Sequence, residues 1–288
     1  MSQSTPKSGS GSRVALKSVA FYVFLVLFVL VSVFPLLWVF KMSIISKTEL
    51  YASPPTFIPH SFTSESYSKI FTDPNTKFPR AILNSVIIAG STTIICLLFG
   101  SLAAYAIARL KFRLRTPILT LILAISFFPQ VAIIAPLFLE FSRFGIINTY
   151  LAMIIPDTVF ALPLTIWLLV AFFRELPFDL EDAAKVDGAT TMQAFWRVTM
   201  PLAAPGVFTT AILTFIFAWN DFIFANTFAF DPESQPVTVA IPQFATVFTV
   251  DYAAQAAGAI VVTVPLVILV LIFQRRIVSG LTAGAVKG

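Results

Sequence analysis

The spacing of charged residues constrains the fold of this chain more than any other feature. Five windows of at least 23 residues contain no Lys, Arg, Asp or Glu, and a sixth is interrupted only by Asp157. A bilayer core about 30 Å thick needs about 20 apolar residues of helix, because every backbone N–H and C=O must be satisfied internally there. We therefore expect an all-α membrane protein with six transmembrane helices, at residues 18–40, 81–108, 116–139, 144–173, 198–220 and 252–274.

Composition excludes an ordinary soluble domain. The 19 basic and 14 acidic residues amount to 11% of the chain, where about a quarter is usual. Cys96 is the single cysteine and cannot form an intramolecular disulfide. The net charge of +5 comes without a compact basic run, so it indicates membrane orientation rather than nucleic-acid binding. A further charge-free window, 234–250, is rich in Pro, Gln and Thr, which favours a loop.

The basic residues also indicate topology. If both termini are cytoplasmic, 13 of the 19 Lys and Arg residues fall on the inner side, several of them directly beside span ends. Such a bias predicts an N-in, C-in protein of the cell membrane. We expect a disordered cytoplasmic tail at 1–17, a six-span domain at 18–280 and a cytoplasmic tail at 281–288. The first apolar window is too long for a cleaved signal peptide, and no small-residue cleavage site follows it.

The cytoplasmic segment 174–204 connects the fourth and fifth spans. We expect Asp179 to cap a short helix and Gly188 to end it. Thr190 and Gln193 have the spacing of a capping box for a second helix, which Pro201 ends or bends into the next span. On physical grounds alone, an amphipathic connector lying on the lipid headgroups explains this segment equally well.

The same segment resembles a known signature. Asp182, Ala183 and Ala184 are followed by three residues, Gly188, nine residues and Val198-Thr199-Met200-Pro201. Permease subunits of ABC importers carry E-A-A, three residues, G, nine residues and I-x-L-P. Residues 217–222 (FAWNDF) and the C-terminal 273–288 resemble motifs of the maltose-type carbohydrate permeases. Residues 202–221 and 256–288 look most like the second permease of trehalose importers, and the resemblance covers most of the chain.

The resemblance implies a type I ABC importer permease fold with a cytoplasmic coupling-helix loop that docks on an ATPase. It assigns ATPase coupling to Glu181, Asp182, Ala183, Ala184, Gly188 and Pro201, and leaves open which of the two acidic residues contacts the ATPase. The sequence has no G-x-x-x-x-G-K-[ST] phosphate loop, so we expect a transport subunit that is not an enzyme and binds no cofactor. ATP and Mg then belong to partner ATPase chains.

The implied partners are a second homologous permease, two ATP-binding subunits, an extracytoplasmic sugar-binding protein, the sugar and membrane lipid. The loop at 225–255 has no Lys or Arg, and the resemblance implies that it reaches into the binding protein. Two other classes are weaker. A secondary transporter of small polar solutes should carry ion-coupling residues inside its spans, whereas only Asp157 interrupts one. A membrane enzyme lacks support because His60 is the single histidine.

Polar residues in the middle or outer half of the spans are candidates for a sugar path. Amides and carboxylates would bind hydroxyl groups, and aromatic rings would stack on sugar faces. The candidates are Asn84, Gln130, Asn220 and Asp221, with Trp219 and Phe128 for stacking. Structural roles compete for each polar residue. Asn220 and Asp221 are equally placed to cap the fifth span, Asp157 to begin the fourth, and Gln130 to bond a neighbouring helix.

Overall fold

The computed structural model describes residues 10–245 and 250–283, and within them no β-strand forms. The helices are α1 (Ser10–Ile44), α2 (Lys47–Leu50), α3 (Glu65–Thr72), α4 (Phe78–Arg109), α5 (Arg115–Ile125), α6 (Gln130–Arg143), α7 (Leu151–Glu175), α8 (Asp179–Val186), α9 (Thr191–Ala194), the π-helix η1 (Phe195–Thr199), α10 (Met200–Leu202), α11 (Ala204–Trp219), α12 (Ile223–Phe228), α13 (Val237–Ala240), the 3₁₀ helix η2 (Ile241–Phe244) and α14 (Tyr252–Ala283). The expectation of an all-helical chain is confirmed for these residues.

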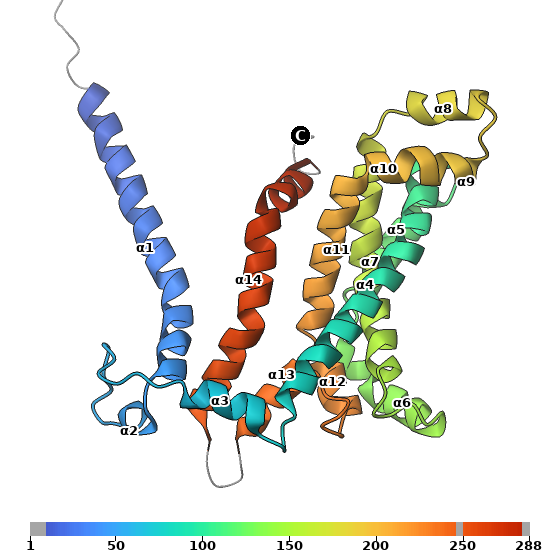
Figure 1. The fold of residues 1–288 in the computed structure, drawn as a ribbon. Helices are drawn as coiled ribbons and strands as arrows, with labels where there is room; N and C mark the ends of the chain where they lie inside the picture. The colour runs from blue at the N-terminus through green and yellow to red at the C-terminus, as the bar shows by residue number, and fades with distance from the viewer. Residues whose placement is uncertain (1–9, 246–249, 284–288) are drawn as a thin grey trace, which may run out of the picture.

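The two expected tails are shorter than the sequence indicates. Helix α1 already begins at Ser10, inside the segment expected to be disordered, and α14 continues to Ala283. The rest of the expected tails, residues 1–9 and 284–288, lies outside the described residues. In Figure 1 the start of α1 and the end of α14 lie at the same end of the molecule as α8.

Within the part of the chain that the structure describes, four unbroken helices are long and apolar enough to cross a membrane, namely residues 17–44 of α1, α4, α7 and the first 23 residues of α14. The other two expected spans are bent pairs. Helices α5 and α6 meet at 82°, and residues 191–202 meet α11 at 78°. The first bend follows from Pro129, which lacks an N–H and keeps the chain extended where α6 begins. The count of six spans holds if each bent pair is one span.

Helices α4, α7 and α11 form the most closely packed part of the molecule, on the right in Figure 1. Small residues allow close approach here, as is usual between membrane helices. A Cβ on Gly206 of α11 would lie 2.3 Å from the ring of Phe172 on α7, and one on Gly100 of α4 would lie 3.0 Å from Thr165. In the most apolar window of α7, 67% of the residues are buried within the chain, against none for α1 and 17% for α14.

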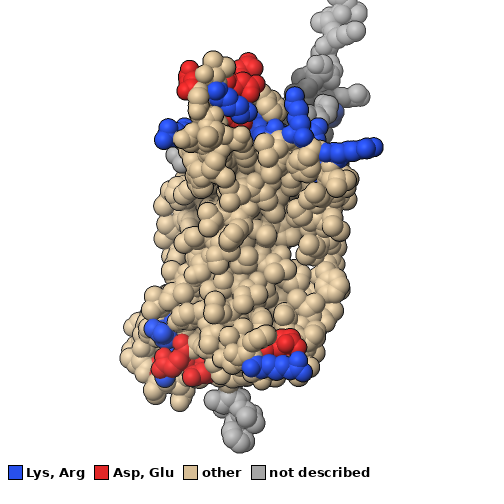
Figure 2. All heavy atoms as spheres, turned by 90° about the vertical axis from the view of Figure 1, so that its right-hand side faces the viewer, with Lys and Arg blue, Asp and Glu red and all other residues tan. Residues whose placement is uncertain are grey.

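Charge gathers at the two ends of the molecule. On the face drawn in Figure 2, Lys, Arg, Asp and Glu occupy both ends, and the broad band between them is uncharged. A lipid hydrocarbon layer requires such a band. The upper end carries the expected cytoplasmic segment 174–204, which forms α8 to α10. The helical bundle therefore carries short helices and loops at both ends, with α8 to α10 at one end and α2, α3, α12 and α13 at the other.

Candidate functional site

The segment 174–204 folds into two short helical rods at the end of the bundle (Figure 1). The expected capping role of Asp179 is wrong, because Phe178 holds the N-cap position and makes no side-chain cap bond. Asp179 instead lies in the first turn of α8 with Glu181 and Asp182. Acidic charge there stabilises the positive end of the helix dipole.

The turn between the two rods follows the sequence signals. Gly188 adopts φ +88°, a left-handed conformation that glycine accepts without strain, and its N–H donates to Lys185 O at 3.0 Å. The capping box is confirmed. The N–H of Gln193 donates to Thr190 Oγ1 at 3.3 Å, and the N–H of Thr190 donates to Gln193 Oε1 at 2.8 Å. The bend expected at Pro201 occurs two residues later, where α11 begins.

Glu181 points into the protein and anchors α8. Its side chain is 4% exposed, and its Oε1 lies 2.9 Å from Nε of Arg109, which is 2% exposed at the end of α4. The hydroxyl of Tyr105 donates to Oε2 at 3.1 Å, and the hydroxyl of Thr199 in η1 donates to Oε1 at 2.9 Å. The guanidinium also lies 4.3 Å from the ring centroid of Phe178. One carboxylate thus joins α8, η1 and the end of the second expected span.

Asp182 lies on the opposite, exposed side of α8. Its carboxylate is 69% exposed and approaches only as close as 3.5 Å to Lys185 Nζ. Ala183 and Leu180 are also exposed, and Ala184 is half-buried. The structure thereby separates the two acidic residues that the sequence could not distinguish. The carboxylate of Glu181 already binds side chains of this chain, whereas no described residue covers the face of α8 that carries Asp182.

The path candidate Asp221 and the intramembrane acid Asp157 meet at a small cavity. Asp157 of α7 and Asp221, just after α11, line a cavity of about 10 Å³, enough for one water molecule. Asp157 is 1% exposed, and its Oδ2 has no hydrogen-bond partner among the described residues. Asp221 accepts from the backbone N–H groups of Phe224 at 3.4 Å and Ala225 at 3.0 Å. The Asp221 carboxylate therefore does have a helix-capping role, as one of the two sequence-based hypotheses proposed. It caps the start of α12 and not the end of α11.

Asn84 and Trp219 are held inside the protein. Nδ2 of Asn84 donates to the backbone oxygens of Glu233 at 2.8 Å and Gln235 at 2.9 Å, and its Oδ1 accepts from the hydroxyl of Tyr150 at 2.7 Å. The ring of Trp219 is 7% exposed in the core. These contacts favour structural roles, Asn84 fixing the outer loop and Trp219 packing the bundle.

The remaining path candidates are more accessible. Gln130 is half-buried as the first residue of α6, and Phe128 is 51% exposed in the break before it, beside Phe127. Asn220 is exposed, and its Nδ2 donates to Ile216 O at 2.7 Å. The six candidates therefore do not converge on one cavity in this conformation. Sequence position placed the polar candidates in the middle or outer half of the spans but could not indicate which way each side chain points.

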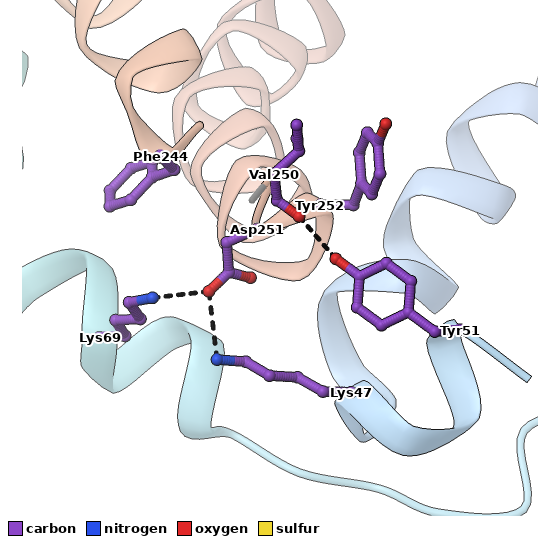
Figure 3. Close-up of a pocket in the computed structure, with 7 residues that line it drawn as sticks. All are labelled: Lys47, Tyr51, Lys69, Phe244, Val250, Asp251 and Tyr252. Atoms are coloured by element: carbon purple, nitrogen blue, oxygen red, sulfur yellow. Dashed lines mark hydrogen bonds and ion pairs between the residues drawn. The ribbon is translucent and has the colours of Figure 1, made fainter. Parts of the chain in front are cut away.

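The end of the molecule away from α8, which is the expected outer end, holds a pocket of about 540 Å³ that sequence reasoning missed (Figure 3). Nζ of Lys47 and Nζ of Lys69 lie 3.2 and 2.6 Å from the same oxygen, Oδ2 of Asp251. Partial burial acts to raise the pKa of Asp251, but the hydrogen bonds from the two lysines hold that pKa below its ordinary value. The lining residues are Lys47, Tyr51, Lys69, Phe244, Val250, Asp251 and Tyr252. They come from three distant segments, so no local motif marks the pocket.

A second carboxylate organises the outer segment beside this pocket. Glu49 accepts hydrogen bonds from Ser61, from the backbone N–H of His60 at 2.9 Å and from the Thr56 hydroxyl at 2.9 Å. The Ser61 hydroxyl is the strongest cause that lowers the pKa of Glu49, to about 2. His60 therefore contributes its backbone here, and Glu49 fixes the chain between α2 and α3.

These features define a multi-pass helical membrane protein with a two-rod loop anchored at one end. Residues 96–282 match the family described as "Binding-protein-dependent transport system inner membrane component". The chain is 45% identical, over 88% of its length and 92% of the relative's, to the "Trehalose transport system permease protein SugB" of Mycobacterium tuberculosis (strain CDC 1551 / Oshkosh). It is 37% identical, over 95% and 98%, to the "Trehalose/maltose transport system permease protein MalG" of Thermococcus litoralis (strain ATCC 51850 / DSM 5473 / JCM 8560 / NS-C).

A solved structure agrees with the fold. A chain of a bacterial ABC transporter involved in the import of the acidic polysaccharide alginate superposes with a TM-score of 0.79. The match covers 94% of this chain and 99% of that chain at 22% identity. The chain belongs to the family of binding-protein-dependent transport system inner membrane components. The resemblance expected from the signature in 182–201 is confirmed.

Proposed function

We propose that this chain is the permease subunit of an ATP-driven, binding-protein-dependent importer of trehalose- or maltose-like di- or oligosaccharides. It forms half of the translocation path and couples to a separate ATPase. The observation that carries the proposal is the α8 rod, which is anchored inward through Glu181 and leaves its other face uncovered. The family membership and the trehalose and maltose transport named for two relatives support the substrate class.

The uncovered face of α8 is the surface that docks on the ATPase. Asp182, Ala183 and Leu180 lie on this face, and Ala184 lies at its edge. Asp182 is the acidic residue that meets the partner, because the Glu181 carboxylate is already occupied by three side chains of this chain. ATP and Mg bind to two partner subunits, since the sequence has no phosphate loop.

Both termini face the cytoplasm, with six crossings when the two bent pairs each count as one. In the six-span topology 13 of the 19 basic residues fall on the cytoplasmic side, and this bias supports the orientation. The arrangement in Figure 1 supports it, because the start of α1 and the end of α14 lie at the same end of the molecule as α8 to α10. The chain then sits in the cell inner membrane, with α2, α3, α12 and α13 at the extracytoplasmic side.

A second, homologous permease covers part of the apolar surface that this chain leaves open. The most apolar window of α1 has no buried residue, and that of α14 has 17%, although both are membrane-span candidates. Membrane lipid covers the rest. The sugar-binding protein meets the outer loop 225–255, although residues 246–249 of that loop lie outside the described residues.

Reconstitution tests the proposal directly. The chain, its partner permease, the ATPase and the binding protein are assembled in proteoliposomes, and uptake of labelled trehalose and maltose is measured. We expect that uptake requires two components. ATP must be present on the side of the membrane that carries the ATPase, and the binding protein must be present on the opposite side. Uptake driven by a proton or sodium gradient without ATP would overturn the proposal and favour a secondary transporter.

A further inference from the structure

The outer pocket has the dimensions of a small-molecule site. Its volume of about 540 Å³ lies within the range of about 300 to 1,000 Å³ that is common for ligand pockets. The rings of Tyr51 and Tyr252 form one wall, with centroids 6.3 Å apart, and both side chains are largely exposed. Phe244 lies opposite and is buried (Figure 3). The pocket therefore offers aromatic faces that a ligand can reach.

The polar side of the pocket has more hydrogen-bond donors than acceptors. Lys47 and Lys69 share a single oxygen of Asp251, and its Oδ1 accepts from the backbone N–H of Ala254 at 3.1 Å. The hydroxyl of Tyr51 is already donated to Val250 O at 2.5 Å. Each ammonium carries three N–H groups, so N–H groups remain free of Asp251 on both lysines. The three charges sum to +1, which favours a ligand rich in oxygen acceptors.

The pocket also occupies a place where substrate arrives, if the proposed function is right. It joins the first outer segment, through α2 and α3, to the base of the outer loop, where Ala245 and Val250 form a bridge. Sugars are bound in proteins by stacking their carbon faces on aromatic rings and by hydrogen bonds to charged side chains. The pocket supplies both elements.

We propose that this outer pocket binds one saccharide unit on its way into the membrane domain. The ring stacks on Tyr252 and Tyr51, and its oxygens accept hydrogen bonds from Lys47 and Lys69. The excess positive charge makes a sugar acid bind more tightly than a neutral sugar of the same size. A single carboxylate side chain of a docking protein fills only a small part of about 540 Å³, so a sugar fits the volume better. This inference rests on the proposed function and adds a site to it.

Binding without the other components tests the site. The complete transporter in lipid nanodiscs, without ATP or binding protein, is titrated calorimetrically with trehalose, with maltose and with a glucuronate-containing disaccharide. We expect Tyr252→Ala to weaken all three by about tenfold, since an aromatic face is lost. Lys69→Gln should remove most of the preference for the acidic disaccharide.

A matched control lies on the same outer end. Lys77 pairs with Glu233 outside the pocket and is equally exposed, so Lys77→Gln should leave all sugar affinities unchanged. Unaltered affinities in both Tyr252→Ala and Lys69→Gln would overturn the site. Weaker association of the binding protein with unaltered sugar affinity would also overturn it, and would assign the pocket to protein docking. Variant-sensitive sugar binding without ATP-driven uptake would uphold the pocket and reject the importer.

Discussion

An ion cluster joins distant segments at each end of the molecule, but water reaches the two clusters differently. At the α8 end, the side chains of Glu181 and Arg109 are 4% and 2% exposed. At the outer end, Asp251 is 14% exposed and its partners Lys47 and Lys69 are 47% and 41% exposed. Removing one partner of a buried pair costs about 3 to 5 kcal/mol, whereas exposed pairs contribute about 0 to 1 kcal/mol. The ion pair at the α8 end should therefore contribute far more to stability than the ion pairs at the opposite end.

The largest effect is expected from Glu181→Ala. The change leaves the Arg109 guanidinium buried without its carboxylate, so the free energy of unfolding should fall by about 3 to 5 kcal/mol. Denaturant unfolding in detergent, followed by the fluorescence of the four tryptophans, measures it. A loss no greater than that of Asp251→Ala would contradict the contrast between the two ends.

A double variant separates charge from packing. Replacing both Glu181 and Arg109 by methionine removes the uncompensated charge, so we expect it to recover most of the stability lost in Glu181→Ala. ATP hydrolysis per transported sugar is measured alongside. If Glu181 positions α8 for coupling, Glu181→Gln should raise the number of ATP molecules hydrolysed per transported sugar even though the protein stays folded. A residue that only stabilises the fold would leave this ratio unchanged.

A second comparison uses two glycines that both have positive φ. Gly188 has φ +88° beside α8, Gly145 has φ +66° in the outer turn after α6, and a Cβ would meet nothing within 4 Å at either position. Alanine at either site should cost about 1 to 2 kcal/mol, because a left-handed conformation is strained for it. Only Gly188→Ala should uncouple ATP hydrolysis from uptake. Equal uncoupling by Gly145→Ala would remove the special role of the α8 loop.

A smaller effect is expected from Asp251→Asn. Its carboxylate is partly exposed, so solvent screening limits the loss of stability to about 1 kcal/mol or less. The folded pKa of Asp251 lies below its unfolded value of about 3.9, so this contribution is present above pH 4 and disappears as pH falls through the lower folded pKa. Melting temperatures of wild type and variant should differ at pH 6 and converge in acid. A difference that grows in acid would contradict the assignment.

The sequence predicted the spans because lipid excludes charge, and this rule acts on every residue of a window. Pro201 indicated the bend before α11 to within two residues, whereas the 82° bend before α6 was not predicted, since apolar composition does not indicate where a helix turns. Gly188 and the Thr190 capping box were predictable because their signals are local. The outer pocket was not, since Lys47, Lys69 and Asp251 meet only through the tertiary fold.

The adjacent acids Glu181 and Asp182 show the same limit at finer scale. Successive helix residues point about 100° apart, so the two side chains cannot both point directly at the bundle. The resemblance placed the signature on Asp182, but only the position of Arg109, at the end of a different span, reveals that Glu181 is the inward one. Periodicity identified a helix with two faces, and the tertiary contacts assigned those faces.

The smallest effect on stability is expected from Asp182→Asn, and this variant tests the proposed docking face most selectively. The carboxylate is 69% exposed and lies 3.5 Å from Lys185 Nζ, so the free energy of unfolding should change by less than about 0.5 kcal/mol. If this face docks on the ATPase, binding of the ATPase and coupled uptake should both weaken severalfold. Asp179→Asn in the same first turn is the matched control, because it removes an equal charge outside the signature. Equal losses in both variants would mean that α8 contributes only its overall charge, and the outward face would lose its specific role.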